Sequence, residues 1–277
     1  MGVSTRLLTI AIVCKDDSLA LSETLRSIQT CVGMEDHGLI DVIIGYSTSS
    51  NESLTLDTSL YSFEIDVLLI EDNSIYNAMN LVREGLKGFF SVYINCGDLV
   101  LNGFRCALQI IRRDYLLERG EYIYMLNTYH SDIAKYRNGI YVGRFSPRWY
   151  SRLFGMSSEH CGWIVWSSIY RNGEFDENLK FCADYKRMYE IALSGVAIRD
   201  LRKMPCAIAP LSYGFSSQHM GISAYLEECR VLLSLKIGNS KKFVGVLYRL
   251  IRIIPSAVKV MTKRIKNRKS SKLGQVP

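Results

Sequence analysis

Polar residues that could bind a charged ligand follow three apolar segments of the sequence. They occupy residues 47–51, residues 71–73 and residues 95–98, and the last group reads Asn-Cys-Gly-Asp. A carboxylate such as Asp98 suits a divalent cation that carries phosphate oxygens, and a glycine beside it lets the backbone approach a ligand closely. The same residue types form turns, so an Asx turn that closes the preceding strand is the alternative.

The elements that must position these groups alternate between strands and helices. Apolar runs predict strands at Leu7–Cys14, Ile40–Ile44, Ile65–Ile70 and Phe89–Ile94. Helical spacing of apolar residues predicts helices at Leu19–Ile28, Ile75–Leu86 and Phe104–Leu117. This alternation predicts βαβ units and an α/β fold with a mostly parallel sheet. Ligands of such a sheet bind beyond the carboxyl ends of its strands, which is where the three polar groups fall.

The second half of the chain has a less regular pattern. Strands are expected at Tyr122–Leu126, Gly139–Phe145 and Val196–Leu201, and helices at Phe181–Ser194 and Ile222–Leu235. A chain of 277 residues is long enough to bury a full core. We therefore expect one globular domain over residues 1–238 and a separate tail over residues 239–277.

Composition and cysteine spacing narrow the class of protein. Hydrophobic residues make up 48% of the chain and charged residues 22%, as in ordinary globular domains. The eight cysteines form no CxxC pair, so no zinc ribbon or thioredoxin-like site is indicated, and unpaired thiols favour a reducing, cytoplasmic compartment. The first apolar run, Leu7–Cys14, is too short for a membrane span and poor for a signal peptide.

The net charge of +7 comes from the tail. Eleven of the 34 Lys and Arg residues follow residue 240, where Asp and Glu do not occur, which leaves 23 basic against 27 acidic residues in the body. A body that binds nucleic acid would carry its positive charge on the folded surface. We therefore expect no nucleic-acid partner.

The tail also has the pattern of an amphipathic helix. One face of a helical wheel carries apolar residues: Phe243, Leu247, Leu250, Ile251, Ile254, Val258 and Met261. The opposite face carries basic residues: Lys242, Arg249, Arg252, Lys259 and Lys263. The pattern predicts that residues 241–269, with a kink or break at Pro255, lie on an anionic membrane surface without crossing it. The alternative is a helix packed on the body, followed by a disordered basic end.

Five motifs resemble one protein family in order and spacing. They are residues 9–13 (TIAIV) with residues 21–28 (LSETLRSI), residues 71–88 (EDNSIYNAMNLVREGLKG) with residues 93–99 (YINCGDL), residues 158–160 (SEH), residues 175–185 (FDENLKFCADY) and residues 219–223 (HMGIS). Together they are similar to family 2 inverting glycosyltransferases of the GT-A fold. The resemblance is to a bacterial branch that builds surface polysaccharides such as O-antigen or capsule, including colanic-acid-type enzymes.

The resemblance implies a nucleotide-sugar donor and a divalent cation, Mg²⁺ or Mn²⁺. Asp98 would be the metal-binding carboxylate of the family's DxD-like motif, in which Asn95 replaces the first Asp. The residues expected at the nucleotide are Asp72, Asn73, Asn80 and Asn95. Asn73 could also cap the helix that starts near Ile75.

The resemblance also implies an acceptor side. Asp184 would be the general base that deprotonates the acceptor hydroxyl, although an acidic residue in a first helical turn is also favoured by the helix dipole alone. His160 would contact the acceptor or serve as a structural residue, and His219 would reach the metal or the diphosphate. Tyr76 could stack on a sugar ring, but packing is the more frequent role of an aromatic side chain.

Two classes of function follow from these implications. The first is an inverting, metal-dependent transferase that adds a sugar to a lipid-linked glycan, carried on polyprenyl diphosphate, at the inner face of the cell membrane. The second is a non-catalytic, membrane-associated scaffold of the same fold, because residues 45–49 (Gly-Tyr-Ser-Thr-Ser) lack the Asp with which the family reads the nucleobase. A dehydrogenase or methyltransferase is not indicated, since no glycine-rich phosphate loop follows the first strand.

Overall fold

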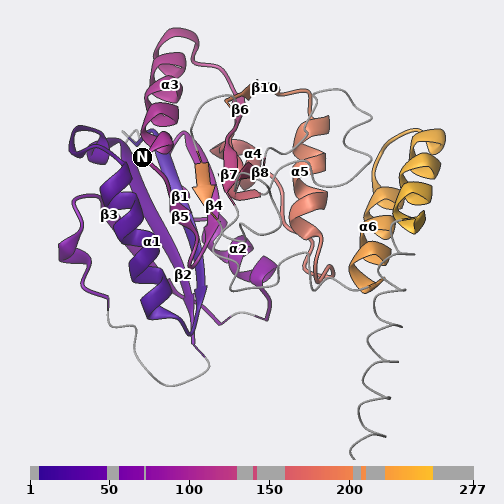
Figure 1. The fold of residues 1–277 in the computed structure, drawn as a ribbon, viewed down its shortest axis with the longest axis horizontal. Coiled ribbons are helices and arrows are strands. Elements are labelled where there is room, and N and C mark those ends of the chain that lie inside the picture. The colour runs from indigo at the N-terminus through magenta and orange to yellow at the C-terminus, as the bar shows by residue number, and fades with distance from the viewer. Residues whose placement is uncertain are drawn as a thin grey trace, which may run out of the picture.

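A computed structural model gives the fold of the chain (Figure 1). It describes residues 6–48, 56–71, 73–129, 140–141, 160–201, 207–209 and 222–251. Within these ranges, no helix combines the length and the apolar character that a membrane span requires.

The main sheet has seven strands in the order β10-β6-β9-β4-β1-β2-β3. The strands are β1 (Leu8–Lys15), β2 (Ile40–Ser47), β3 (Glu64–Leu69), β4 (Phe90–Asn95), β6 (Tyr122–Met125), β9 (Trp163–Trp166) and β10 (Ala197–Asp200). Neighbouring strands are parallel except at β9, which is antiparallel to both β4 and β6. The predicted α/β fold with a mostly parallel sheet is therefore confirmed, and β9 is a strand that the sequence pattern did not predict.

Helices cover both faces of this sheet. They are α1 (Ser18–Cys31), α2 (Ile75–Arg83), α3 (Gly103–Glu118), α4 (Ser167–Arg171) and α5 (Ala183–Leu193). In β1, Leu8, Ile10 and Ile12 join the core under α1 and α3. Ala11 and Val13 join the core under α2 and α5. Because both faces are buried, the strand reads as a continuous apolar run and not as an alternating one.

A second, smaller sheet lies beside the main one. Its strands, in the order β5-β11-β7-β8, are β5 (Leu99–Val100), β11 (Ala207–Ala209), β7 (Asn127–Tyr129) and β8 (Ile140–Tyr141). The pattern predicted a strand around β8 but not the other three. Strands of two or three residues carry almost no periodicity, and they form because distant partners pair with them.

The C-terminal part adds two further helices, α6 (Ile222–Ser234) and a helix over residues 239–251. In Figure 1, α5 lies between the sheet and α6, and α6 and the yellow helix that follows it lie at the right-hand side of the molecule. A third apolar cluster joins Tyr185 and Tyr189 of α5 to Leu232 of α6, with Val246 packed against it.

One prediction for this helix was wrong. The helical wheel placed Arg249 on the basic face, away from the apolar contact surface, but Arg249 is fully buried and lies against α5 and α6. The wheel shows which residues share a face, and it cannot show which face meets the body. The predicted apolar residues Phe243, Leu247 and Leu250 are the ones that face outward.

Candidate functional site

The segment after β4 forms a tight turn. The N–H of Asp98 donates to the carbonyl oxygen of Asn95 (3.0 Å), and the Asp98 carboxylate accepts the N–H of Asn95 (2.8 Å). Gly97 has a φ of 91°, a backbone conformation that residues with a side chain rarely adopt. Its N–H donates to the Thr24 hydroxyl of α1. The turn-forming role considered for Asn95 to Asp98 is therefore confirmed, and Asp98 is only 2% exposed.

The same turn has the oxygen atoms that a hard cation prefers. The amide oxygen of Asn95 is buried and has no hydrogen-bond partner among the described residues. An Asn oxygen and the Asp98 carboxylate suit Mg²⁺ or Mn²⁺, which proteins often hold with one or two carboxylates together with substrate phosphates. The described part of the chain contains no cluster of three or more His, Cys, Asp and Glu side chains that could hold a metal alone. The turn therefore fits a cation only if a diphosphate supplies further ligands.

Two cysteines lie beside this turn. The sulfur atoms of Cys14, in β1, and Cys96 are 2.9 Å apart, and each lies 3.3 Å from the carbonyl oxygen of Asp17. The contact with Cys14, followed by burial, raises the pKa of the Cys96 thiol. Without a bound cation, the Cys96 side chain is therefore a neutral thiol at neutral pH.

A second polar group forms around Asp184, in the first turn of α5. One carboxylate oxygen accepts the Tyr76 hydroxyl of α2 (3.2 Å) and the Tyr185 N–H (2.8 Å). The other carboxylate oxygen lies 3.3 Å from Nδ1 of His160, in the short helix η4 (His160–Gly162). The side chains of His160 and Asp184 are 12% and 16% exposed. Two predicted acceptor-side residues are thus brought together, although they lie on different elements.

Tyr76 is the member of this group whose contact with Asp184 the sequence pattern did not predict. It is buried and stacks on Phe175, with the ring centroids 6.2 Å apart. Burial, and then the nearby Asp184 carboxylate, raises the pKa of Tyr76. Its hydroxyl therefore stays protonated and donates to Asp184. The packing role considered for Tyr76 is present together with this polar contact, which only the fold could reveal.

Asn80, predicted at the nucleotide, binds other parts of the protein. Its side chain donates to the Phe175 carbonyl oxygen (2.9 Å) and to the Glu177 carboxylate (2.8 Å), and accepts the Phe175 N–H (2.8 Å). These bonds tie α2 to the segment that leads to Asp184. Asn80 thereby fixes the position of this segment relative to α2.

Asn73 is exposed and does not cap α2. Ser74 caps the helix instead, since its hydroxyl accepts the N–H of Asn77 (3.1 Å). The capping alternative for Asn73 was therefore one residue out of register. Asp72 and His219 lie outside the described residues.

The short helix η4 contacts elements of both polar groups. This short helix packs on both β4 and α5, so His160 lies between the strand that leads to Asp98 and the helix that carries Asp184. In Figure 1, α2 lies at the lower centre of the molecule, between the sheet and α5. The strand before Asp98 and the helix that carries Asp184 therefore contact a common neighbour.

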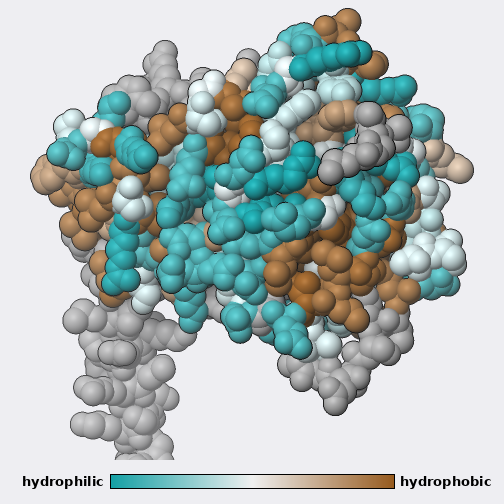
Figure 2. All heavy atoms as spheres, turned by 180° about the vertical axis from the view of Figure 1, so that it is seen from behind, coloured by the Kyte–Doolittle hydropathy of each residue, from teal (hydrophilic) through white to brown (hydrophobic). Residues whose placement is uncertain are grey.

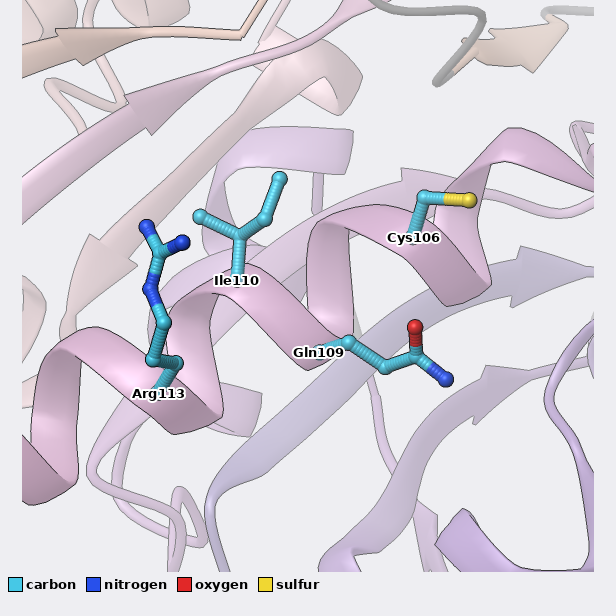
Figure 3. Close-up of a pocket in the computed structure, with 4 residues that line it drawn as sticks. All are labelled: Cys106, Gln109, Ile110 and Arg113. Carbon is cyan, nitrogen blue, oxygen red and sulfur yellow. The ribbon is translucent and has the colours of Figure 1, made fainter.

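A separate surface hollow lies on α3. Figure 3 shows its four side chains, Cys106, Gln109, Ile110 and Arg113, all from this one helix. Because α3 covers the face of the sheet opposite to α2 and α5, the hollow is not part of the site around Asp184.

No family model matches the chain, and no curated protein sequence matches it.

Comparison with solved structures gives clear matches at low sequence identity. TarS from S. aureus (residues 1–349), solved in complex with UDP-GlcNAc, superimposes with a TM-score of 0.58 at 9% identity, over 88% of this chain and 71% of that one. The mannosyltransferase PcManGT from Pyrobaculum calidifontis, in complex with GDP-Man and Mn²⁺, gives a TM-score of 0.57 at 10% identity, over 93% and 79% of the two chains. The chain therefore has the mostly parallel α/β fold of these glycosyltransferase structures.

Proposed function

We propose that this protein transfers a sugar from a nucleotide-sugar donor to a glycan acceptor, with inversion at the anomeric carbon. The observation that carries the proposal is the Asp184 carboxylate, partly exposed and held by Tyr76 and His160, in a fold shared with structures that contain UDP-GlcNAc and GDP-Man. An inverting displacement requires a single carboxylate of this kind, placed on the acceptor side.

In the proposed reaction, Asp184 takes the proton of the acceptor hydroxyl. The hydroxyl oxygen forms a bond to the anomeric carbon while the bond from that carbon to the diphosphate breaks. A carboxylate offers about four acceptor positions, so Asp184 can receive this proton while it keeps its contacts with Tyr76 and His160. These two residues fix the direction in which the carboxylate faces the acceptor.

The turn after β4 would serve the leaving group. Asn95 and Asp98 would hold Mg²⁺ or Mn²⁺ on the diphosphate. The cation would neutralise the charge that develops as the nucleoside diphosphate leaves. In PcManGT the bound cation is Mn²⁺. Asp72 and Asn73, just before α2, are the proposed nucleotide contacts, and His219 is a proposed diphosphate contact.

The direct test is transfer from a panel of nucleotide sugars, followed by Asp184→Asn. We expect kcat to fall by about 10³-fold, as for the loss of a general base, with donor affinity unchanged. The control is Glu23→Gln, which changes an exposed carboxylate of α1 and should leave the rate unchanged. Normal transfer by the Asp184→Asn variant would remove this residue from the mechanism.

We further propose that the acceptor is a lipid-linked glycan at an anionic membrane surface. The helix over residues 239–251 supports this, because Phe243, Leu247 and Ile251 face outward and are 68%, 47% and 57% exposed. Figure 2 shows hydrophobic atoms at the left edge of the molecule, where α6 and this helix lie after the half-turn from Figure 1. Arg249 is buried, and the ten other basic residues after residue 240 would attract anionic lipid.

Vesicle binding tests the membrane proposal. Phe243→Glu combined with Leu247→Glu should release the protein from vesicles that contain anionic lipid, because it places charge on the apolar face. Leu116→Glu combined with Leu117→Glu, at two exposed positions of α3, is the matched control and should not change binding. Equal binding by both double variants would overturn the proposal.

A non-catalytic scaffold remains the second candidate. It is favoured by Asn95 in place of an Asp, by the Gly45 to Ser49 segment without an Asp, and by the use of the Asp98 carboxylate in closing its own turn. Calorimetry with UDP and with GDP, each in the presence of Mn²⁺, separates the two functions. Binding of either nucleotide supports the transferase, whereas binding of neither supports the scaffold.

A further inference from the structure

We infer that Arg249, in the helix over residues 239–251, is a positioning residue for Asp184. The inference rests on the proposed function, because it assigns the C-terminal helix a part in holding the catalytic base. Arg249 would act through its contacts with α5 and α6, without touching the substrate.

The first observation is the complete burial of a charged side chain. Arg249 is 0% exposed, and its guanidinium donates from Nε to the Glu228 carboxylate of α6 (2.7 Å) and from NH2 to the Tyr185 hydroxyl of α5 (2.8 Å). Another nitrogen donates to the Gly245 carbonyl oxygen within its own helix (3.2 Å). Burying a guanidinium is costly unless it is paired, so this arrangement is held as a unit.

The second observation is where this unit meets the site. Tyr185 is buried and directly follows Asp184, and its own N–H donates to the Asp184 carboxylate (2.8 Å). Arg249 therefore fixes the residue immediately after the proposed base. A shift of the Tyr185 ring would move the backbone that orients Asp184.

The third observation concerns the other side of Asp184. The carboxylate of Glu227, next to Glu228 in α6, accepts three consecutive backbone N–H groups, those of Lys180 (3.0 Å), Phe181 (2.6 Å) and Cys182 (2.8 Å). Adjacent carboxylates of α6 thus hold the chain before Asp184 directly and the chain after it through Arg249. The hold is complete only when the helix over residues 239–251 is in place.

The shape of the guanidinium explains why an arginine stands here. Its planar fork reaches a carboxylate and a hydroxyl on two different helices at once, which a lysine ammonium on a flexible stem does poorly. Catalysis is sensitive to displacements of about 1 Å, which can cost roughly 100-fold in rate. Losing the hold should therefore lower kcat and leave donor affinity unchanged.

The test is a double-mutant cycle in the full-length protein, with the variants Arg249→Met, Tyr185→Phe and both together. We expect Arg249→Met to lower kcat for transfer by about tenfold or more, with the donor KM unchanged. Tyr185→Phe should cause a smaller loss, and the double variant should match Arg249→Met alone, because one contact is removed in both. Arg249→Lys should restore only part of the rate.

A control variant and a second measurement distinguish a specific effect of Arg249 from a general effect of losing an arginine. Arg230→Met changes an exposed arginine of α6 and should leave kcat unchanged. Hydrogen exchange should show faster exchange of the amides of residues 180–186 in Arg249→Met but not in Arg230→Met. Unchanged exchange in this segment, additive losses in the cycle, or an unchanged kcat in Arg249→Met would each overturn the inference. Should the wild-type protein transfer no sugar, the proposed function fails, and hydrogen exchange alone decides whether Arg249 holds this segment.

Discussion

Different interactions hold the two polar groups in place, the turn after β4 and the segment around Asp184. The turn follows a buried strand, and it is fixed by backbone hydrogen bonds and by a glycine at positive φ. The Asp184 segment is fixed by polar side chains that reach across the sequence, such as the bond from Tyr76, which is 108 positions away. The position of Asp98 therefore depends on the sheet, and the position of Asp184 depends on a network of individual side chains.

The largest loss of stability is expected from a substitution at Gly88, which lies just before β4 in the main sheet. A Cβ atom there would lie 2.6 Å from the Thr9 backbone nitrogen and 2.8 Å from the Leu8 carbonyl carbon. Since backbone atoms cannot move aside cheaply, Gly88→Ala should lower the free energy of unfolding by about 3 kcal/mol or more. Chemical denaturation measures the loss. Gly38→Ala, where a Cβ meets nothing within 4 Å, should change stability little, and equal losses at both positions would contradict the argument.

The next largest loss of stability is expected from a substitution at Asn80, which joins α2 to the segment before Asp184. Asn80→Ala removes three hydrogen bonds and leaves the backbone groups of Phe175 without partners, so we expect a loss of about 2–3 kcal/mol in unfolding free energy. Thermal denaturation provides the measurement. Asn172→Ala, at an exposed position, is the control. A loss below that of the control would show that Asn80 is not a tie between the two regions.

A substitution at Tyr76 tests the hydrogen bond that the proposed base, Asp184, accepts. Tyr76→Phe keeps the stack on Phe175 and removes only the hydroxyl that donates to Asp184, so kcat should fall by about tenfold while donor affinity stays the same. Tyr170→Phe is the matched control, since the buried Tyr170 hydroxyl has no hydrogen-bond partner within the described ranges. Steady-state kinetics of both variants decide, and an equal response of the two would remove the hydroxyl contact from the mechanism.

The smallest effect on stability is expected at Asp41, which is buried in β2 of the main sheet. Burial raises its pKa to about 6, although the Thr9 hydroxyl donates to the carboxylate and opposes the shift. A folded pKa above the unfolded value favours the protonated form, so this stabilisation is full below the unfolded pKa of 3.8 and is lost as the pH rises through about 6. Between pH 5 and 7.5 the wild-type protein should lose about 1 kcal/mol from this group. Denaturation of Asp41→Asn across the same range should lack this loss, and an identical slope would contradict the assignment.

The same contrast explains which features the sequence could predict. The runs at β1, β2 and β4 are mainly apolar and buried, so these strand positions and the parallel fold follow from local pattern, as does the turn that contains Gly97. Asp184 and His160 were proposed from family resemblance, but their contact joins two elements that local pattern cannot bring together. The strand β9, from Trp163 to Trp166, is short and pairs with partners far away in the sequence.

Two further features could be identified only from the three-dimensional structure, because they depend on which way a side chain or the backbone is oriented. A helical wheel groups Arg249 with other basic residues, yet only the packing of α5 and α6 determines that it faces inward. Likewise, Ser74 and Asn73 are both good capping residues, and only the backbone at the start of α2 selects Ser74.

The position of β9 has a consequence for how the chain folds. Because β9 inserts between β4 and β6, the main sheet cannot be continuous until residue 163 has been synthesised, and β4 is left with an unpaired side until then. An unpaired strand edge is a template for pairing with other chains, and non-local pairing is slow. Nascent chains that end before β9 should therefore aggregate more readily than the complete protein.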